Sequence, residues 1–101
     1  MNLPGYEQLR ASLNSQFIIS NDHGQRQVCE LIAVSERIVH NDFESFSASF
    51  KAVDFNALNQ GIYNFAHEQI GTCQMFVSPY ELAPDRRPLF EAVFNRQISP
   101  A

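Results

Sequence analysis

Apolar and polar residues alternate with a period of two along several short stretches of the chain. The clearest case is the stretch 43–53, FESFSASFKAV, where apolar side chains recur at every second position from Phe46 to Phe50 and serines lie between them. Because successive side chains of a β-strand point to opposite faces, this pattern predicts a half-buried strand. The serine row at 45, 47 and 49 is expected to face solvent, as the polar faces of antiparallel strands commonly do.

Patterns of the same kind predict one short helix and six strands. Tyr6, Leu9 and Leu13 recur at helical spacing, which predicts a helix over about residues 6–13. The strands are expected at about residues 17–20, 27–35, 43–53, 61–68, 72–78 and 89–96. The first two are separated by Asn-Asp-His-Gly at 21–24, a sequence typical of a tight turn, and should therefore form a hairpin.

The stretch 60–78, QGIYNFAHEQIGTCQMFVS, is expected to form a central hairpin of two strands joined around Gly71. Tyr63, Phe65 and His67 would then share one face of the first strand. Some of these residues also have near-helical spacing, but the segment is short, holds two aromatic residues and has a glycine near each end. These features favour the hairpin over a helix.

The predicted strands are short and separated by turn signals, a pattern typical of small all-β proteins. We therefore predict a single domain over residues 1–101, a small antiparallel β-sandwich or barrel of about six strands with one short N-terminal helix. Segment 79–88 contains three prolines and is expected to be a long loop. Phe55 and Leu58 are expected to tuck under the sheet edge. The predicted phenylalanine-rich core consists of Phe46, Phe50, Phe65, Phe76, Phe90 and Phe94.

Composition restricts the kinds of partner that the chain can bind. The formal net charge is −4 at neutral pH and the chain has a single lysine, whereas nucleic-acid binding needs clustered lysine and arginine. No apolar run approaches the length that crosses a membrane, and the N-terminus lacks the features of a secretory signal. We therefore expect a cytoplasmic protein that binds neither nucleic acid nor membrane.

The two cysteines, Cys29 and Cys73, lie far apart in the sequence among apolar neighbours, and no CxxC motif is present. In the absence of a secretory signal, this pattern favours two buried thiols over a disulfide or a redox pair.

No established catalytic signature, such as GxSxG, HExxH or a glycine-rich phosphate loop, occurs in the chain. We therefore predict a non-enzymatic protein with no cofactor and no metal site. His23 lies in a polar turn beside Asp22, but no second histidine stands at a spacing suited to a shared metal ion. We interpret His23 as a solvated turn residue.

Three residues are candidates for ligand binding: Tyr63, His67 and Arg96. His67 could serve as a general base in an aromatic pocket or be held by a backbone carbonyl at the end of its strand. The lack of a partner at suitable spacing favours the structural role. Arg96 could hold a carboxylate or phosphate through two parallel hydrogen bonds, or it could tie its strand end to Glu91, Glu68 or a carbonyl. The second role of Arg96 is again favoured.

Three segments in combination resemble a family of short bacterial proteins classed as a domain of unknown function. The segments are FESFSASF at 43–50, QGIYNFAHEQIG with the following FVSP from 60 to 79, and FEAVFNR at 90–96. The resemblance covers most of the chain beyond about Val28 and departs from the family pattern in segment 79–88, where other members are richer in glycine. It implies no activity. It does imply an accessory protein encoded near proteins that resemble phage-tail collar proteins.

The favoured functional hypothesis is a non-catalytic protein-interaction or accessory module of a phage-tail-like assembly. Its partner would be another protein or a second copy of the chain, and exposed strand edges would permit pairing with a partner strand. The alternative is a small-ligand or carbohydrate-binding domain that uses the face of Tyr63, Phe65 and His67. A third hypothesis, less favoured, is an enzyme with His67 as its base.

Overall fold

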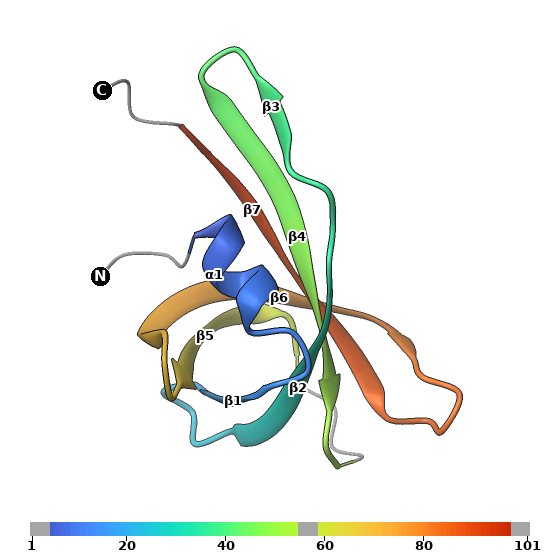
Figure 1. The fold of residues 1–101 in the computed structure, drawn as a ribbon. Coiled ribbons are helices and arrows are strands. Elements are labelled where there is room, and N and C mark those ends of the chain that lie inside the picture. Colours follow the sequence, from blue (N-terminus) through green and yellow to red (C-terminus); the bar gives the residue numbers. More distant parts are fainter. Residues whose placement is uncertain (1–4, 55–58, 98–101) are drawn as a thin grey trace.

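The computed structural model describes residues 5–54 and 59–97, which form one short helix and seven β-strands (Figure 1). The elements are α1 (Tyr6–Ala11), β1 (Gln16–Ser20), β2 (Arg26–Val34), β3 (Ile38–His40), β4 (Phe43–Ala52), β5 (Gly61–His67), β6 (Gly71–Leu82) and β7 (Pro88–Gln97). All six predicted strands are present. The helix ends at Ala11, earlier than predicted, and β3 is a strand that the sequence pattern did not indicate.

Six of the strands close into an antiparallel barrel (Figure 1). Their order is β2–β1–β5–β6–β7–β4, and the pairing of β2 with β4 joins the two ends. Hairpins connect β1 with β2, β5 with β6 and β6 with β7, whereas the β1–β5, β4–β7 and β2–β4 pairings join distant segments of the chain. The predicted all-β fold with one N-terminal helix is confirmed. Of the two architectures considered, the chain forms the barrel.

Phenylalanine side chains fill the barrel. Phe17, Phe50, Phe65 and Phe90 are each at most 1% exposed. The rings of Phe17, Phe50 and Phe65 contact one another, with centroids 5.2, 5.3 and 6.3 Å apart. Burial of one such side chain contributes about 1.5–3 kcal/mol to folding. The barrel interior is therefore an aromatic core, to which Phe17 contributes although the sequence analysis did not include it.

One predicted core residue, Phe76, is not in the core. Its side chain is 52% exposed, whereas Cys73, Met75 and Val77 on the same strand are buried. The run CQMFV carries apolar residues at both parities, so its periodicity does not reveal which face is internal. The β5–β6 register decides the matter, because it places Met75 directly opposite the buried Tyr63.

The predicted long loop at 79–88 is also wrong. Strand β6 continues to Leu82 and β7 begins at Pro88, so residues 83–87 form a short turn between them. Proline is tolerated in strands at bulges and at the first residue. Pro79 adjoins a shift of register between Pro79 and Glu81, and Pro88 starts its strand. Phe55 and Leu58, which were expected under the sheet edge, lie outside the described residues.

Three strands continue beyond the barrel as an arm (Figure 1). Strand β4 pairs with β2 in the barrel and then with β3 through residues 43–45, and it stays paired with β7 along nearly its whole length. Strand β6 accompanies β7 only as far as Ala92. We define the arm as β3 with residues 43–47 of β4 and 93–97 of β7. In the described part of the chain, no strand pairs with residues 93–97 on the side away from β4.

Candidate functional site

Two of the three candidate ligand-binding residues, Tyr63 and His67, lie on the inner face of β5. Tyr63 is 2% and Phe65 is 1% exposed, so both belong to the barrel core. The Tyr63 hydroxyl donates to the backbone carbonyl of Asn59 at 2.6 Å, and burial raises the pKa of this phenol. The face formed by Tyr63, Phe65 and His67 was predicted correctly, but it is packed inside the barrel and only its His67 end reaches the surface.

Both ring nitrogens of His67 take part in hydrogen bonds that hold the side chain in place. The backbone N–H groups of Gln69 and Ile70 donate to Nδ1 at 3.1 and 3.2 Å. Because Nδ1 accepts, the proton of a neutral imidazole is assigned to Nε2, which lies 2.8 Å from Ser15 Oγ and donates to it. The ring also packs against Phe17 at a centroid distance of 4.4 Å. His67 therefore closes the β5–β6 turn and joins it to the start of β1.

In the Ser15–His67 hydrogen bond the histidine donates and the serine accepts, which is the reverse of a nucleophile–base pair. A catalytic histidine accepts the serine proton at one nitrogen and donates from the other to an orienting group. Here the Ser15 hydroxyl donates instead to the backbone carbonyl of Ser12, and both His67 nitrogens are already used. The geometry supports the structural role of His67. Its partners are a serine and two amides, not the carbonyl that was expected.

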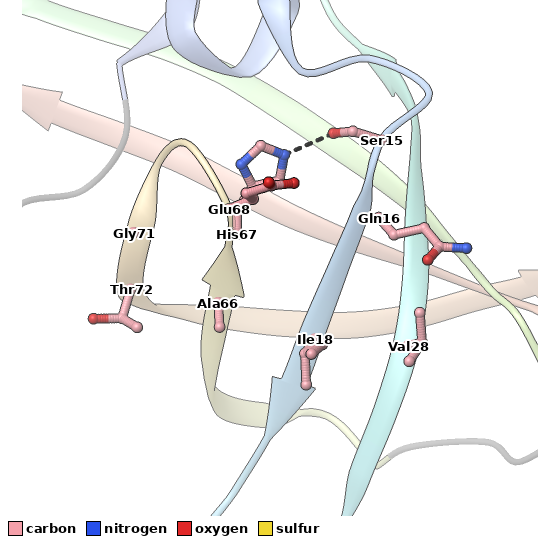
Figure 2. Close-up of a pocket in the computed structure, with 9 residues that line it drawn as sticks. All are labelled: Ser15, Gln16, Ile18, Val28, Ala66, His67, Glu68, Gly71 and Thr72. Carbon is pink, nitrogen blue, oxygen red and sulfur yellow. Dashed lines mark hydrogen bonds between the residues drawn. The ribbon is translucent and has the colours of Figure 1, made fainter.

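An open groove of about 720 Å³ lies on the outer wall of the barrel beside this pair (Figure 2). Its floor is a row of side chains directly opposite one another on β2, β1, β5 and β6: Val28, Ile18, Ala66 and Thr72. Figure 2 shows Ser15 and His67 at one end, with Gln16 and Glu68 also in the lining. The groove has a largely apolar floor and polar side chains at one end, a combination common in small-ligand sites.

The third candidate, Arg96, lies on the arm and belongs to a separate cluster. Arg96 Nε donates to Glu44 Oε1 at 2.7 Å, and Arg37 Nε donates to Oε2 of the same carboxylate. Glu44 is 8% exposed, and the two arginines, Arg96 first, lower its pKa. The Arg96 guanidinium also lies over the Phe46 ring, 5.7 Å from its centroid. The expected partners of Arg96 were wrong, but its expected structural tie to a carboxylate exists.

The β4–β7 register explains the partner that sequence reasoning missed. It places Glu44 directly opposite Arg96, although the two are 52 residues apart in the chain. One signal was available: Glu44 has the same parity as Phe46 and Phe50 on the most regular strand, so the pattern already placed a carboxylate on the buried face. A buried carboxylate needs a cationic partner, and Arg96 was a candidate.

A pocket of about 400 Å³ adjoins this cluster. It is lined by Arg37, Glu44 and Arg96 and by the residues 5–8 at the start of α1. In the described residues, neither guanidinium makes a hydrogen bond other than the one from Nε to Glu44. The remaining N–H groups of both arginines are therefore available to an acceptor in the pocket.

A second charged cluster occupies the turn between β6 and β7. The carboxylate of Asp85 accepts from Arg87 Nε at 2.8 Å and pairs with Lys51 Nζ at 3.0 Å, and these bonds hold its pKa far below its usual range. All three side chains are between 26% and 39% exposed. All three side chains therefore remain in contact with solvent.

Other chemistry is sparse in the described residues. Cys29 and Cys73 are free and buried, and burial raises the pKa of Cys29 to about 12 and also raises that of Cys73. Thiols in this state are poor nucleophiles. Within residues 5–54 and 59–97, no group of three or more His, Cys, Asp or Glu side chains could hold a metal ion. The same residues contain no helix of the length and apolarity that crossing a membrane would need.

Comparison of the chain with curated proteins returned no match, and comparison with solved structures returned none either. A family model does match, and it covers residues 4–94, which is most of the chain. The description of that family is a domain of unknown function, DUF6916. This agrees with the resemblance noted from the segments at 43–50, 60–79 and 90–96. The chain therefore belongs to the DUF6916 family.

Proposed function

We propose that this protein is a non-catalytic interaction module that docks onto an extended segment of a larger protein through its arm. The observation that carries the proposal is the unpaired edge of β7 at residues 93–97. The orientation of the Ser15–His67 pair and the burial of both thiols support the non-catalytic character.

An unpaired strand edge is a template for another strand, because its backbone N–H and C=O groups have no partner in the sheet. On the arm, β3 pairs only with β4, and β6 leaves β7 at Ala92 with nothing in the described chain to take its place. The exposed edge contains a single charged residue, Arg96, and no proline. Proteins commonly block edge pairing with charged residues and proline, so an edge with one charge and no proline is weakly protected. An extended peptide is the occupant whose hydrogen-bonding pattern fits it.

The outer face of the arm presents apolar side chains next to this edge. Ile38, Phe43 and Val93 are 62%, 51% and 64% exposed, and the β3–β4 and β4–β7 registers place them on one face with Ser45 and Asn95. Two shallow hollows of about 390 and 280 Å³ lie on this face and share Ile38 and Ser45. Apolar side chains of a docked strand would pack here, and alternate side chains give such complexes their specificity.

The larger protein that we propose as partner belongs to a tail- or fibre-like assembly, a proposal that rests on the family resemblance alone. We place the module in the cytoplasm, where free thiols such as Cys29 and Cys73 persist.

Site-specific photo-cross-linking in cells of the source organism tests the docking. A photoreactive residue at Val93 is compared with one at Ile62, which lies on β5 and is 63% exposed, against 64% for Val93. The proposal expects a cross-linked product with a larger protein from position 93, little from position 62, and loss of the product when Ile38→Lys is added. Equal yields at the two positions, or none at 93, overturn the docking. A product that contains only a second copy of the chain overturns the choice of partner.

The groove beside His67 favours a second candidate function, the binding of a small ligand. Its volume of about 720 Å³ lies within the range of ligand sites, roughly 300–1,000 Å³. Native mass spectrometry of protein purified gently from its source tests this function. A reproducible small adduct that Ala66→Trp on the groove floor eliminates would support it, and the absence of any adduct would count against it.

A further inference from the structure

The cluster of Arg37, Glu44 and Arg96 contains more hydrogen-bond donors than its internal role uses. A guanidinium has five N–H donors, and each arginine commits one of them to Glu44. Fixing β3 and β7 to β4 accounts for these two bonds. It does not account for the pocket of about 400 Å³ on which the same three side chains border.

The two guanidiniums are held in place before any ligand arrives. Glu44 fixes both Nε atoms, and Arg96 lies over the ring of Phe46, which is itself stacked against Phe94 at a centroid distance of 4.7 Å. The side chain of Arg37 is 40% exposed and that of Arg96 is 27% exposed, so a ligand in the pocket meets donors that are partly shielded from water. Preorganised donors lose little side-chain entropy on binding, and partial burial strengthens their attraction for an anion.

The charges that line the pocket disfavour a ligand with more than one negative charge. The two guanidiniums are balanced by the carboxylates of Glu44 and of the exposed Glu7, which also borders the pocket, so the lining has no excess positive charge for a dianion. A dianion such as phosphate would meet two carboxylates, whereas a carboxylate carries one charge and has the planar geometry that a guanidinium fork matches. Both arginines already donate from Nε to a carboxylate oxygen of Glu44.

We propose that the pocket between Arg37, Glu44, Arg96 and the start of α1 binds a carboxylate group. The carboxylate comes from a side chain or free acid, or from the C-terminus of a peptide. This site lies on the inner face of the arm and does not depend on strand docking at residues 93–97.

The test is an NMR titration of the arginine Nε–Hε signals with sodium acetate, with sodium chloride at matched ionic strength as the reference. The proposal expects saturable shifts for Arg37 and Arg96. It also expects Glu44→Gln, which removes the internal competitor and one negative charge, to tighten acetate binding by about fivefold or more. Arg37→Gln, which leaves Glu44 paired with Arg96, should weaken binding. A purely structural cluster would show no saturable shift in the wild-type protein, although acetate could replace the missing carboxylate in Glu44→Gln.

The turn between β6 and β7 provides a matched control, because Lys51, Asp85 and Arg87 have the same charges but border none of the described pockets. Asp85→Asn should therefore produce no acetate site at Arg87. Equal binding at Arg87, or no saturable shift at Arg37 and Arg96 in the wild-type protein, overturns the proposal.

Further probes separate the sources of the ligand. N-acetylglutamate amide carries only a side-chain carboxylate, and N-acetylalanine carries only a C-terminal one. Tighter binding of N-acetylglutamate amide identifies a side-chain carboxylate as the ligand, and tighter binding of N-acetylalanine identifies a peptide C-terminus. Equal binding shows that the carboxylate group alone is recognised. Each of these three results supports the site. Tighter binding of inorganic phosphate than of acetate overturns the assignment to a carboxylate.

Discussion

Replacement of Glu44 by glutamine should destabilise the fold, because this nearly isosteric change removes a buried charge that two arginines share. Glu44 is 8% exposed, and its carboxylate accepts from Arg96 Nε at 2.7 Å and from Arg37 Nε. Glutamine keeps the shape and one acceptor oxygen but loses the charge and the second acceptor. Each arginine then lacks its anionic partner.

The expected loss follows from the exposure of the two arginines. A hydrogen bond to a charged group contributes about 1.5–3 kcal/mol, and a value near the lower end suits Arg96, whose side chain is 27% exposed. Arg37 is 40% exposed, so its bond contributes at most about 1 kcal/mol, as surface ion pairs do. Because glutamine keeps one acceptor oxygen and so retains part of this hydrogen-bond energy, we expect the free energy of unfolding to fall by about 2 kcal/mol in total. That corresponds to a fall in Tm of roughly 8–16 °C for a domain of this size.

The loss should also depend on pH. The pKa of Glu44 is lowered in the folded state from its ordinary value of 4.5. Its stabilising effect is therefore complete above that value and disappears as the pH falls through the lowered pKa. Urea denaturation at pH 7 and at successively lower pH should show the gap between wild type and Glu44→Gln closing in acid.

Glu81→Gln is the control for this experiment, because Glu81 is exposed, and we expect it to change the free energy of unfolding by less than about 0.5 kcal/mol. A gap between wild type and Glu44→Gln that stays constant from neutral to acidic pH would refute the charge argument. A gap no larger than that of the control would refute the argued role of burial.

Three further predictions concern the core, the thiols and the central turn. Phe50→Ala should cost about 3–5 kcal/mol in urea denaturation, and Phe76→Ala, at a side chain 52% exposed, less than about 1 kcal/mol; similar costs would contradict the assigned strand faces. Iodoacetamide at about pH 8 should leave Cys29 and Cys73 unmodified in the folded protein and alkylate both in urea, because burial raises both pKa values; rapid labelling of the native protein would disprove their burial. Gly71→Ala should lower the free energy of unfolding by about 1–2 kcal/mol, because φ is +90° there and alanine is strained at that angle. No neighbour would contact the new methyl group, so a steric clash does not contribute, and an unchanged Tm would refute backbone strain as the reason for glycine.

Strands whose two faces differ in polarity could be predicted from the amino-acid sequence alone. In β4 the serines and phenylalanines alternate, so the strand, its buried face and the membership of Phe46 and Phe50 in the core could all be predicted. The turn at Gly71 was equally clear, because glycine adopts the positive φ of +90° that this hairpin requires. These features depend on local conformation and on a period of two, both of which are properties of the nearest residues in the chain.

Features that depend on pairing between distant segments could not be predicted from the sequence and became visible in the folded chain. Closure of the barrel requires β2 to pair with β4 and β1 with β5, and no local pattern encodes those partners. The same pairings select the inner face of β6 and so expose Phe76. They also bring Arg96 to Glu44 across 52 residues, and they end the β6–β7 ladder at Ala92, which leaves the arm with an open edge. A side chain's neighbours across a sheet are set by strand register, which is a property of the whole fold.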